Sequence, residues 1–205
     1  LVVPEVNGHL LSSCRQGIIS NPNCVVIPLV TALKPLQENF GFDLVQVATY
    51  QSVSGAGAKG VFELKQQEKA LVKQESLSPK VFPWQISHNL IPMVGPITEN
   101  GSCDEEIKVA EESQKILQQP NLSFLVSTVR LPIYYCHGEA VTVRLSKEAS
   151  LENIQEAFQS QKSIRFCFSR SSSQNCVMFC DDLPSARGKV QRPAKHSQRI
   201  SGDHA

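Results

Sequence analysis

The chain has 205 residues, 41% hydrophobic and 19% charged, so it is long and apolar enough to bury a sizeable core. Its 20 Lys and Arg and 19 Asp and Glu leave a formal net charge of +1, which argues against nucleic acid or an anionic membrane as a partner. No apolar run approaches the roughly 20 residues that a membrane span needs. The seven cysteines follow no disulfide-framework spacing, which favours a reducing, cytoplasmic location.

The N-terminal part predicts a strand and then a helix that begins beside a cysteine. The stretch LVVPEV is typical of a strand. Further along, Cys24 follows Asn-Pro-Asn and precedes apolar side chains at helical spacing, and Gly41 ends the pattern as a C-terminal cap does. We therefore expect Cys24 at or near a helix N-terminus. The helically spaced residues are Leu29, Ala32, Leu33, Leu36 and Phe40.

The following residues predict alternating strands and helices. β-Branched residues over 43–50 indicate a strand, and residues 61–74 indicate a long helix. Residues 76–101 contain several Pro and Gly and predict an ordered loop region or short strands. Acidic residues in the first turn favour a helix over 103–119. The alternation predicts an α+β domain with a mixed β-sheet and helices on one face. The remaining expected elements are strands over 122–133 and 139–145 and a helix over 150–160 capped by Ser150.

Three residues are candidates for chemistry or ligand binding. Cys24 is either a buried structural cysteine or a nucleophile, whose thiol pKa a helix N-terminus lowers. His137 lies in the turn between two expected strands, where it is either a packing residue or a functional one. Arg130 lies on an otherwise apolar strand, so its guanidinium needs an anion from the protein or from a ligand.

A cluster of charges opens the expected helix over 103–119. Glu105, Glu106 and Lys108 suit a solvated helix face. Alternatively, Glu105 and Lys108 are three residues apart on one face and offer opposite charges to a small zwitterion. No His and Cys spacing resembles a zinc site, so we expect no metal. The sequence also has no Gly-rich dinucleotide fingerprint.

Seven stretches of the first 145 residues carry independent motifs: LVVPEVN, GIISNPNC, ALKPL, TYQSVSGAGAKG, NLIPMV, EEIKVAEESQKIL and VRLPIYYCHGEAV. In order and spacing the chain resembles aspartate-semialdehyde dehydrogenases. The resemblance implies a fold like the C-terminal domain of glyceraldehyde-3-phosphate dehydrogenases. It implies a remnant of the nucleotide-binding domain and linker over 1–17, a catalytic and dimerisation domain over 18–165, and a divergent, partly disordered tail over 166–205.

The resemblance also implies roles for individual residues. Cys24 is the implied nucleophile, His137 the general acid and base, and Gln51 the residue that orients the covalent intermediates. The implied binding residues are Arg130 for the substrate α-carboxylate, Glu105 for its amino group and Lys108 for phosphate. The implied cofactor contacts are Asn7, Ser54, Gly55 and Gly57. The family's GHSE motif appears here as Cys136, His137, Gly138 and Glu139.

The implied reaction converts aspartate 4-semialdehyde, phosphate and NADP into aspartyl phosphate and NADPH. It belongs to lysine, diaminopimelate, threonine and methionine biosynthesis, and the implied protein is a cytoplasmic homodimer. We expect an incomplete NADP site, because the family's Gly-rich loop is not found in this sequence. Two alternatives are a non-catalytic dimerisation domain and, less favoured, a cysteine hydrolase that uses Cys24 and His137.

Overall fold

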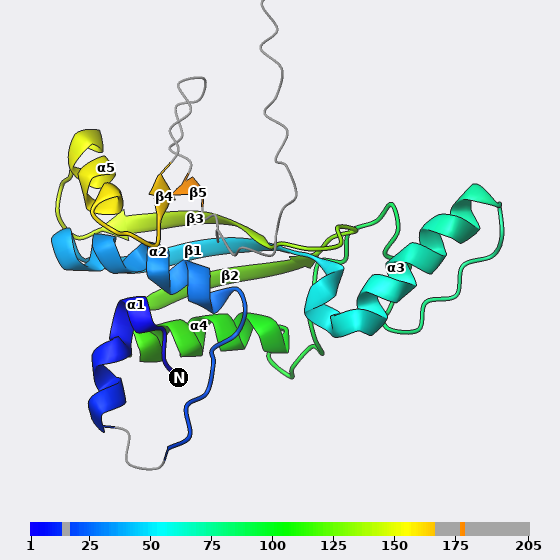
Figure 1. Ribbon diagram of the computed structural model, residues 1–205, viewed down its shortest axis with the longest axis horizontal. Coiled ribbons are helices and arrows are strands. Elements are labelled where there is room, and N and C mark those ends of the chain that lie inside the picture. Colours follow the sequence, from blue (N-terminus) through cyan, green and yellow to red (C-terminus); the bar gives the residue numbers. More distant parts are fainter. Residues whose placement is uncertain (14–16, 167–176, 179–205) are drawn as a thin grey trace, which may run out of the picture.

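The computed structural model describes residues 1–13, 17–166 and 177–178, in which a three-stranded sheet carries helices on one face (Figure 1). This confirms the expected α+β architecture. In chain order the elements are α1 (Pro4–Asn7), the 3-10 helix η1 (Gly8–Ser13), α2 (Val26–Asn39), β1 (Phe42–Gln51), the 3-10 helix η2 (Val53–Ala56), α3 (Gly57–Val72), α4 (Asp104–Ile116), β2 (Ser123–Arg130), β3 (Gly138–Leu145), α5 (Leu151–Gln159), β4 (Arg165–Phe166) and β5 (Val177–Met178).

The main sheet is mixed, with β1 in its centre. β1 pairs parallel with β2 and antiparallel with β3. Gln51 pairs with Arg130 at the C-terminal ends of β1 and β2, and Tyr50 pairs with Gly138 at the start of β3. The C-terminal ends of β1 and β2, with Gln51 and Arg130, therefore lie beside the turn that carries His137, at one end of the sheet.

The hydrophobic core lies between the sheet and the helices α2 and α4. Alternate side chains of β1 point into it, and Val45 and Val47 are 0% and 1% exposed. They belong to one buried cluster with Leu29 and Leu33 of α2 and Val109 of α4. Full burial of each such side chain contributes about 1.5–3 kcal/mol, so this cluster fixes both helices against the sheet.

The other side of the sheet, which we call the open sheet face, carries Gln46 and Tyr50 of β1 and Leu125 and Val129 of β2. These residues share a face because side chains alternate along a strand and because Gln46 pairs with Leu125 and Tyr50 with Val129. Tyr50 is 42% exposed and Leu125 57% exposed. The open sheet face thus exposes apolar and aromatic side chains to solvent.

Helix α3 projects from the sheet (Figure 1). Two of its side chains, Glu63 and Gln67, hold the chain segment that follows. The buried Glu63 carboxylate accepts hydrogen bonds from the backbone N–H groups of Lys80 at 2.9 Å and Val81 at 2.5 Å. The Gln67 side-chain oxygen accepts from the backbone N–H of Ile86 at 2.9 Å. The loop expected over 76–101 is therefore ordered, as the sequence predicted.

The N-terminal segment is helical, so the strand expected in LVVPEV is wrong. Pro4 stands in the first turn of α1, where its fixed φ suits a helix and its missing N–H costs nothing. Asn7 closes the turn, because its Oδ1 accepts the backbone N–H of Val3 at 2.8 Å. Val3 and Val6 are buried in the core, so the apolar residues here reflect burial in a helical turn.

The helix expected at 150–160 forms as α5, and Ser150 caps it by accepting the backbone N–H of Asn153 at 3.2 Å. The division into domains at 17 and 165 stays a prediction. Of the tail expected over 166–205, residues 167–176 and 179–205 lie outside the described residues.

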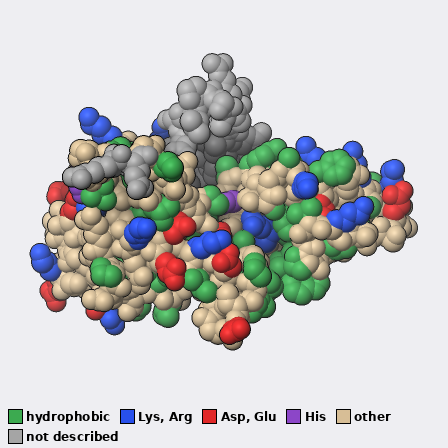
Figure 2. All heavy atoms as spheres, turned by 90° about the horizontal axis from the view of Figure 1, so that it is seen from below, with side chains coloured by type: hydrophobic (Ala, Val, Ile, Leu, Met, Phe, Trp, Pro, Cys, Tyr) green, Lys and Arg blue, Asp and Glu red, His purple; other side chains and the backbone are tan. Residues whose placement is uncertain are grey.

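Charge is mixed over the face of the molecule seen in Figure 2. Acidic and basic side chains lie beside one another there, in keeping with the net charge of +1. Neither sign forms a continuous surface in this view. Within the described ranges, no helix combines the length and the hydrophobicity that crossing a membrane requires.

Candidate active site

Cys24 stands at the N-terminus of α2, as expected from the sequence. The first helical hydrogen bonds run from the backbone N–H groups of Val26 (3.0 Å) and Ile27 (3.3 Å) to the carbonyl oxygen of Asn23. The Asn23 side chain closes a turn just before the helix, because its Oδ1 accepts the backbone N–H of Val25 at 3.0 Å. Cys24 therefore lies directly before the N-cap residue Val25 and two residues before α2 begins at Val26.

His137 lies against Cys24, with 3.3 Å between the sulfur and Nε2. The other ring nitrogen, Nδ1, accepts the backbone N–H of Ser52 at 3.1 Å and lies 3.2 Å from the Ser52 hydroxyl. A nitrogen that accepts an N–H is unprotonated in the neutral ring. Nε2 therefore carries the proton and donates toward the sulfur. The fold thus brings together two residues 113 positions apart in the sequence.

The pKa of the Cys24 thiol is raised above its ordinary value, which corrects the expectation that the helix N-terminus lowers it. Cys24 is exposed as a residue, not a buried structural cysteine, but desolvation of its sulfur by the atoms around it disfavours the thiolate most. The negative charge of Glu105 acts in the same direction. The backbone amides of Cys24 and Val25 and the charge of Arg130 lower the pKa but do not prevail. Burial also lowers the pKa of His137. The resting pair is therefore a neutral thiol beside a neutral imidazole.

Arg130 reaches the same site from the end of β2. It is 8% exposed, and its Nη1 donates a 2.7 Å hydrogen bond to the carbonyl oxygen of Ser52. Gly55 makes room for it, because a Cβ on Gly55 would lie 2.7 Å from this nitrogen and 3.5 Å from the His137 ring. A buried guanidinium thus lies close to the Cys24 and His137 pair.

Glu105 brings a negative charge to the site from the first turn of α4. Its Oε1 accepts a 3.1 Å hydrogen bond from Nε2 of Gln51, which is 1% exposed and also donates to Oγ1 of Thr49 at 3.3 Å. The charges of Glu105 and Arg130 both act on the Cys24 thiol. The site therefore presents one anionic and one cationic group beside the nucleophile, which is the charge pattern that complements a free amino acid.

Lys108 is exposed and points to its own helix. Its Nζ lies 2.5 Å from Oδ2 of Asp104, and this hydrogen bond is the main cause that raises its pKa. An anion at Lys108 would therefore compete with Asp104. The interpretation in which Glu105 and Lys108 act together on one zwitterion is weakened, because each has another partner here.

The four residues expected to contact a cofactor do not form a binding site by themselves. The Asn7 side chain is 2% exposed and bonded to the backbone of Val3 and Leu1. Ser54 bonds Ser52 through their hydroxyls at 2.8 Å. Gly55 packs on Arg130 and His137, while Gly57, with φ of +75°, has open space around it. The described residues therefore do not fit a complete dinucleotide site.

Sequence reasoning missed two residues that touch the site. Ser52 holds the His137 ring, and the one sequence signal for it is its position directly after Gln51. Glu112 accepts the backbone N–H of Asn23 at 2.7 Å, and it lies seven positions after Glu105 on the same side of α4.

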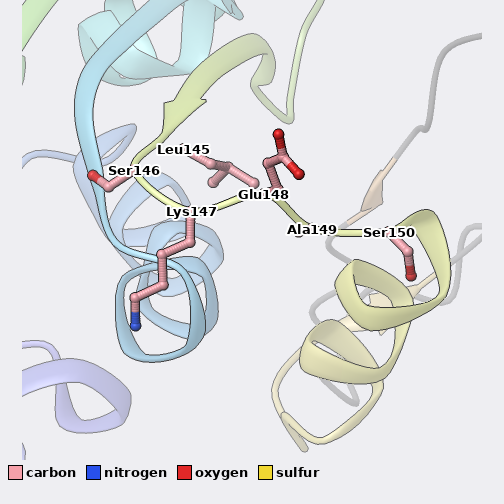
Figure 3. A pocket seen from close by; sticks show the side chains of 6 residues that line it. All are labelled: Leu145, Ser146, Lys147, Glu148, Ala149 and Ser150. Atoms are coloured by element: carbon pink, nitrogen blue, oxygen red, sulfur yellow. The ribbon is translucent and has the colours of Figure 1, made fainter.

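Other features of the surface do not compete with this site. Among the residues that the structure describes, no group of three or more His, Cys, Asp and Glu could hold a metal ion. In a hollow between β3 and α5, Lys147 and Glu148 point in different directions (Figure 3), so they do not form one charged site. The residues that line this hollow are Leu145, Ser146, Lys147, Glu148, Ala149 and Ser150.

Known proteins match the chain over most of its length. It is 38% identical over 212 residues to the aspartate-semialdehyde dehydrogenase of Bacillus subtilis, covering 100% of this chain and 61% of that protein. The enzyme of Aquifex aeolicus is 41% identical over 162 residues, covering 78% of this chain and 47% of that protein. Thus the chain spans about three fifths or less of the length of these curated relatives.

A solved structure and a family model point to the same enzyme family as these relatives. Aspartate semialdehyde dehydrogenase II from Vibrio cholerae, complexed with ASA, superposes with a TM-score of 0.81 at 33% identity, covering 92% of this chain and 54% of that one. The model of the semialdehyde dehydrogenase dimerisation domain matches residues 33–196. The chain therefore belongs to the semialdehyde dehydrogenase dimerisation-domain family.

Proposed function

We propose that this chain supplies the catalytic and substrate-binding part of an NADP-dependent aspartate-semialdehyde dehydrogenase. The observation that carries the proposal is the Cys24 and His137 pair, 3.3 Å apart, with the charges of Arg130 and Glu105 beside it. The relatives named above support the reaction class. The pathways served are lysine, threonine and methionine biosynthesis, in the cytoplasm.

Arg130 and Glu105 bind the two ends of the substrate in this proposal. The guanidinium takes the α-carboxylate, because Arg binds carboxylates through charge-assisted hydrogen bonds. The Glu105 carboxylate takes the ammonium group, and Gln51 holds it in place at 3.1 Å. The aldehyde of a bound amino acid semialdehyde then lies at the sulfur of Cys24. Lys108 binds phosphate after leaving Asp104.

The first covalent step uses only residues of this chain. The sulfur of Cys24 bonds to the aldehyde carbon, and the carbonyl π electrons move to oxygen. Nε2 of His137 gives its proton to that oxygen and receives the thiol proton in return, so a thiohemiacetal forms and the ring stays neutral. This relay suits a ring whose Nδ1 already accepts the Ser52 N–H, because a second ring proton would oppose that bond.

The oxidation needs a hydride acceptor, which NADP supplies when it is bound. Gly57 offers open space at the start of α3, but Asn7, Ser54 and Gly55 are engaged within the protein. The described residues do not fit the whole cofactor, so further residues must complete its site. A dimerisation domain without turnover is the second candidate function, and this incomplete fit is the observation that favours it.

A second copy of the chain is the proposed partner. The family model describes a dimerisation domain, and the open sheet face presents Tyr50 and Leu125 at 42% and 57% exposure. Side chains of this kind favour a protein contact over solvent. We therefore place the homodimer contact on this face.

The test joins this chain to the part of the Bacillus subtilis relative that it does not cover. The joined protein is expected to oxidise aspartate 4-semialdehyde with NADP and phosphate, and Cys24→Ala to abolish this. The 205-residue chain alone is expected to bind NADP weakly and to show negligible turnover, since positioning is worth about 7–11 kcal/mol of barrier. An inactive but folded joined protein would favour the non-catalytic function, and peptide or ester hydrolysis would favour a cysteine hydrolase.

A further inference from the structure

Glu112 connects α4 to the residue that precedes the nucleophile. Its Oε2 accepts the backbone N–H of Asn23 at 2.7 Å, across 89 positions of sequence. The acceptor is a carboxylate, and a hydrogen bond to an ionised acceptor is stronger than one between neutral groups. A bond of this kind between distant elements fixes their relative position.

Asn23 is where this bond has most effect. Its carbonyl oxygen receives the first backbone N–H groups of α2, and its side chain receives the N–H of Val25 at 3.0 Å. The Glu112 bond fixes the remaining polar group of the Asn23 backbone. The chain that enters Cys24 is therefore held on both sides, by α2 and by α4.

Helix α4 also holds the opposite side of the site. Glu105, two helical turns before Glu112, accepts from Gln51 at 3.1 Å. Glu106 ties the start of the helix to β2, because its Oε1 accepts the backbone N–H of Thr128 at 3.2 Å. Val109, between the two turns, is fully buried in the core. One rigid helix thus sets the position of both Glu105 and the segment before Cys24.

We propose that Glu112 is a positioning residue that holds Cys24 in line with His137 by fixing the backbone of Asn23. Without its carboxylate, the segment entering α2 moves, and the contact of 3.3 Å between sulfur and Nε2 is lost. The amides of Cys24 and Val25, which oppose the rise in the thiol pKa, move with it. The consequence for turnover rests on the proposed function, but the consequence for thiol reactivity does not.

The experiment measures alkylation of Cys24 by iodoacetamide at pH 7.5, followed by peptide mass mapping. It compares Glu112→Ala with Glu111→Ala, which removes the same charge from an exposed neighbour. Glu112→Gln keeps an acceptor oxygen and is expected to restore most of the wild-type rate. Glu112→Met keeps the length of the side chain without the oxygen, and serves if the alanine variant does not fold.

A double-mutant cycle with His137→Gln separates positioning from general loosening. In the wild type, His137→Gln is expected to slow alkylation, because an amide cannot take up the thiol proton as an imidazole can. In the Glu112→Ala background the same change is expected to have an effect at least about threefold smaller. An equal effect of His137→Gln in both backgrounds, or an equal loss in Glu111→Ala, would overturn the proposal. Because alkylation needs no cofactor, this result is independent of whether the joined enzyme turns over.

Discussion

Replacing Glu139 by glutamine is expected to stabilise the protein at alkaline pH and to leave it nearly unchanged at acid pH. Glu139 lies on β3 opposite Thr49, and among the described side chains its buried Oε1 has no hydrogen-bond partner. Burial raises the pKa of this carboxyl from 4.5 to about 8. The carboxyl is therefore neutral in the folded protein at pH 7, and ionising it there costs free energy of folding.

The pH window follows from these two values. Below pH 4.5 Glu139 is protonated in the folded and unfolded states alike, so it adds no pH dependence. Between about 4.5 and 8 the unfolded chain loses this proton and the folded protein keeps it, so stability falls as pH rises. At about 1.4 kcal/mol per pKa unit, the loss above pH 8 amounts to about 4–5 kcal/mol. Relaxation of the fold around the charge makes this an upper value.

Urea unfolding between pH 4 and pH 9 measures the effect. The free energy of unfolding of the wild type should fall across this range by about 3–4 kcal/mol more than that of Glu139→Gln. Glu99→Gln, a change at an exposed carboxyl, should follow the wild type. If the free energies of unfolding of the wild type and of Glu139→Gln change in parallel with pH, the Glu139 carboxyl is not held neutral in the folded protein.

Two further predictions concern the site. Gly55→Ala should lower the free energy of unfolding in urea by about 1–2 kcal/mol, because the added Cβ displaces Arg130 from a charged hydrogen bond. Gly138→Ala is the control and should be nearly neutral, because its Cβ would meet only another Cβ at 3.9 Å. Equal stabilities of the two variants would contradict the clash at Gly55. Glu105→Gln should shift the pH profile of Cys24 alkylation to lower pH, because a negative charge that raises the thiol pKa is removed; an unmoved profile would show that Glu105 does not act on the thiol.

The elements of the fold were predictable because local periodicity decides them. The helix after Cys24 and the strand around 43–50 appeared within a few residues of their observed bounds, since apolar spacing alone distinguishes them. LVVPEV was misleading because its first three residues, all apolar, favour a strand equally well. The hydrogen bond that closes the helical turn comes from the Asn7 side chain. A single side-chain contact decides between helix and strand here, and it produces no periodic pattern in the sequence.

The site could be predicted only in part. Cys24, Arg130 and His137 are chemically conspicuous residues, and the resemblance to a family gave them a common purpose before their distances were known. Ser52 and Glu112 act through backbone N–H groups, which every residue other than proline has. The N–H end of each contact therefore carries no signature in residue type, and only the fold reveals which residue it belongs to.

The reactivity of Cys24 depends on a balance that no local rule gives. The helix N-terminus supplies amides that favour the thiolate, yet burial and the Glu105 carboxylate outweigh them. A neutral resting thiol suits this site, because the same carboxylate is the group proposed to receive the substrate ammonium. Once that ion pair forms, the second largest cause of the raised pKa of the Cys24 thiol is offset. The substrate carboxylate offsets the smaller lowering effect of Arg130 at the same time, while the backbone amides stay in place. In the proposed function, the thiol is therefore a better nucleophile when an amino acid occupies the site, which limits its reaction with other electrophiles.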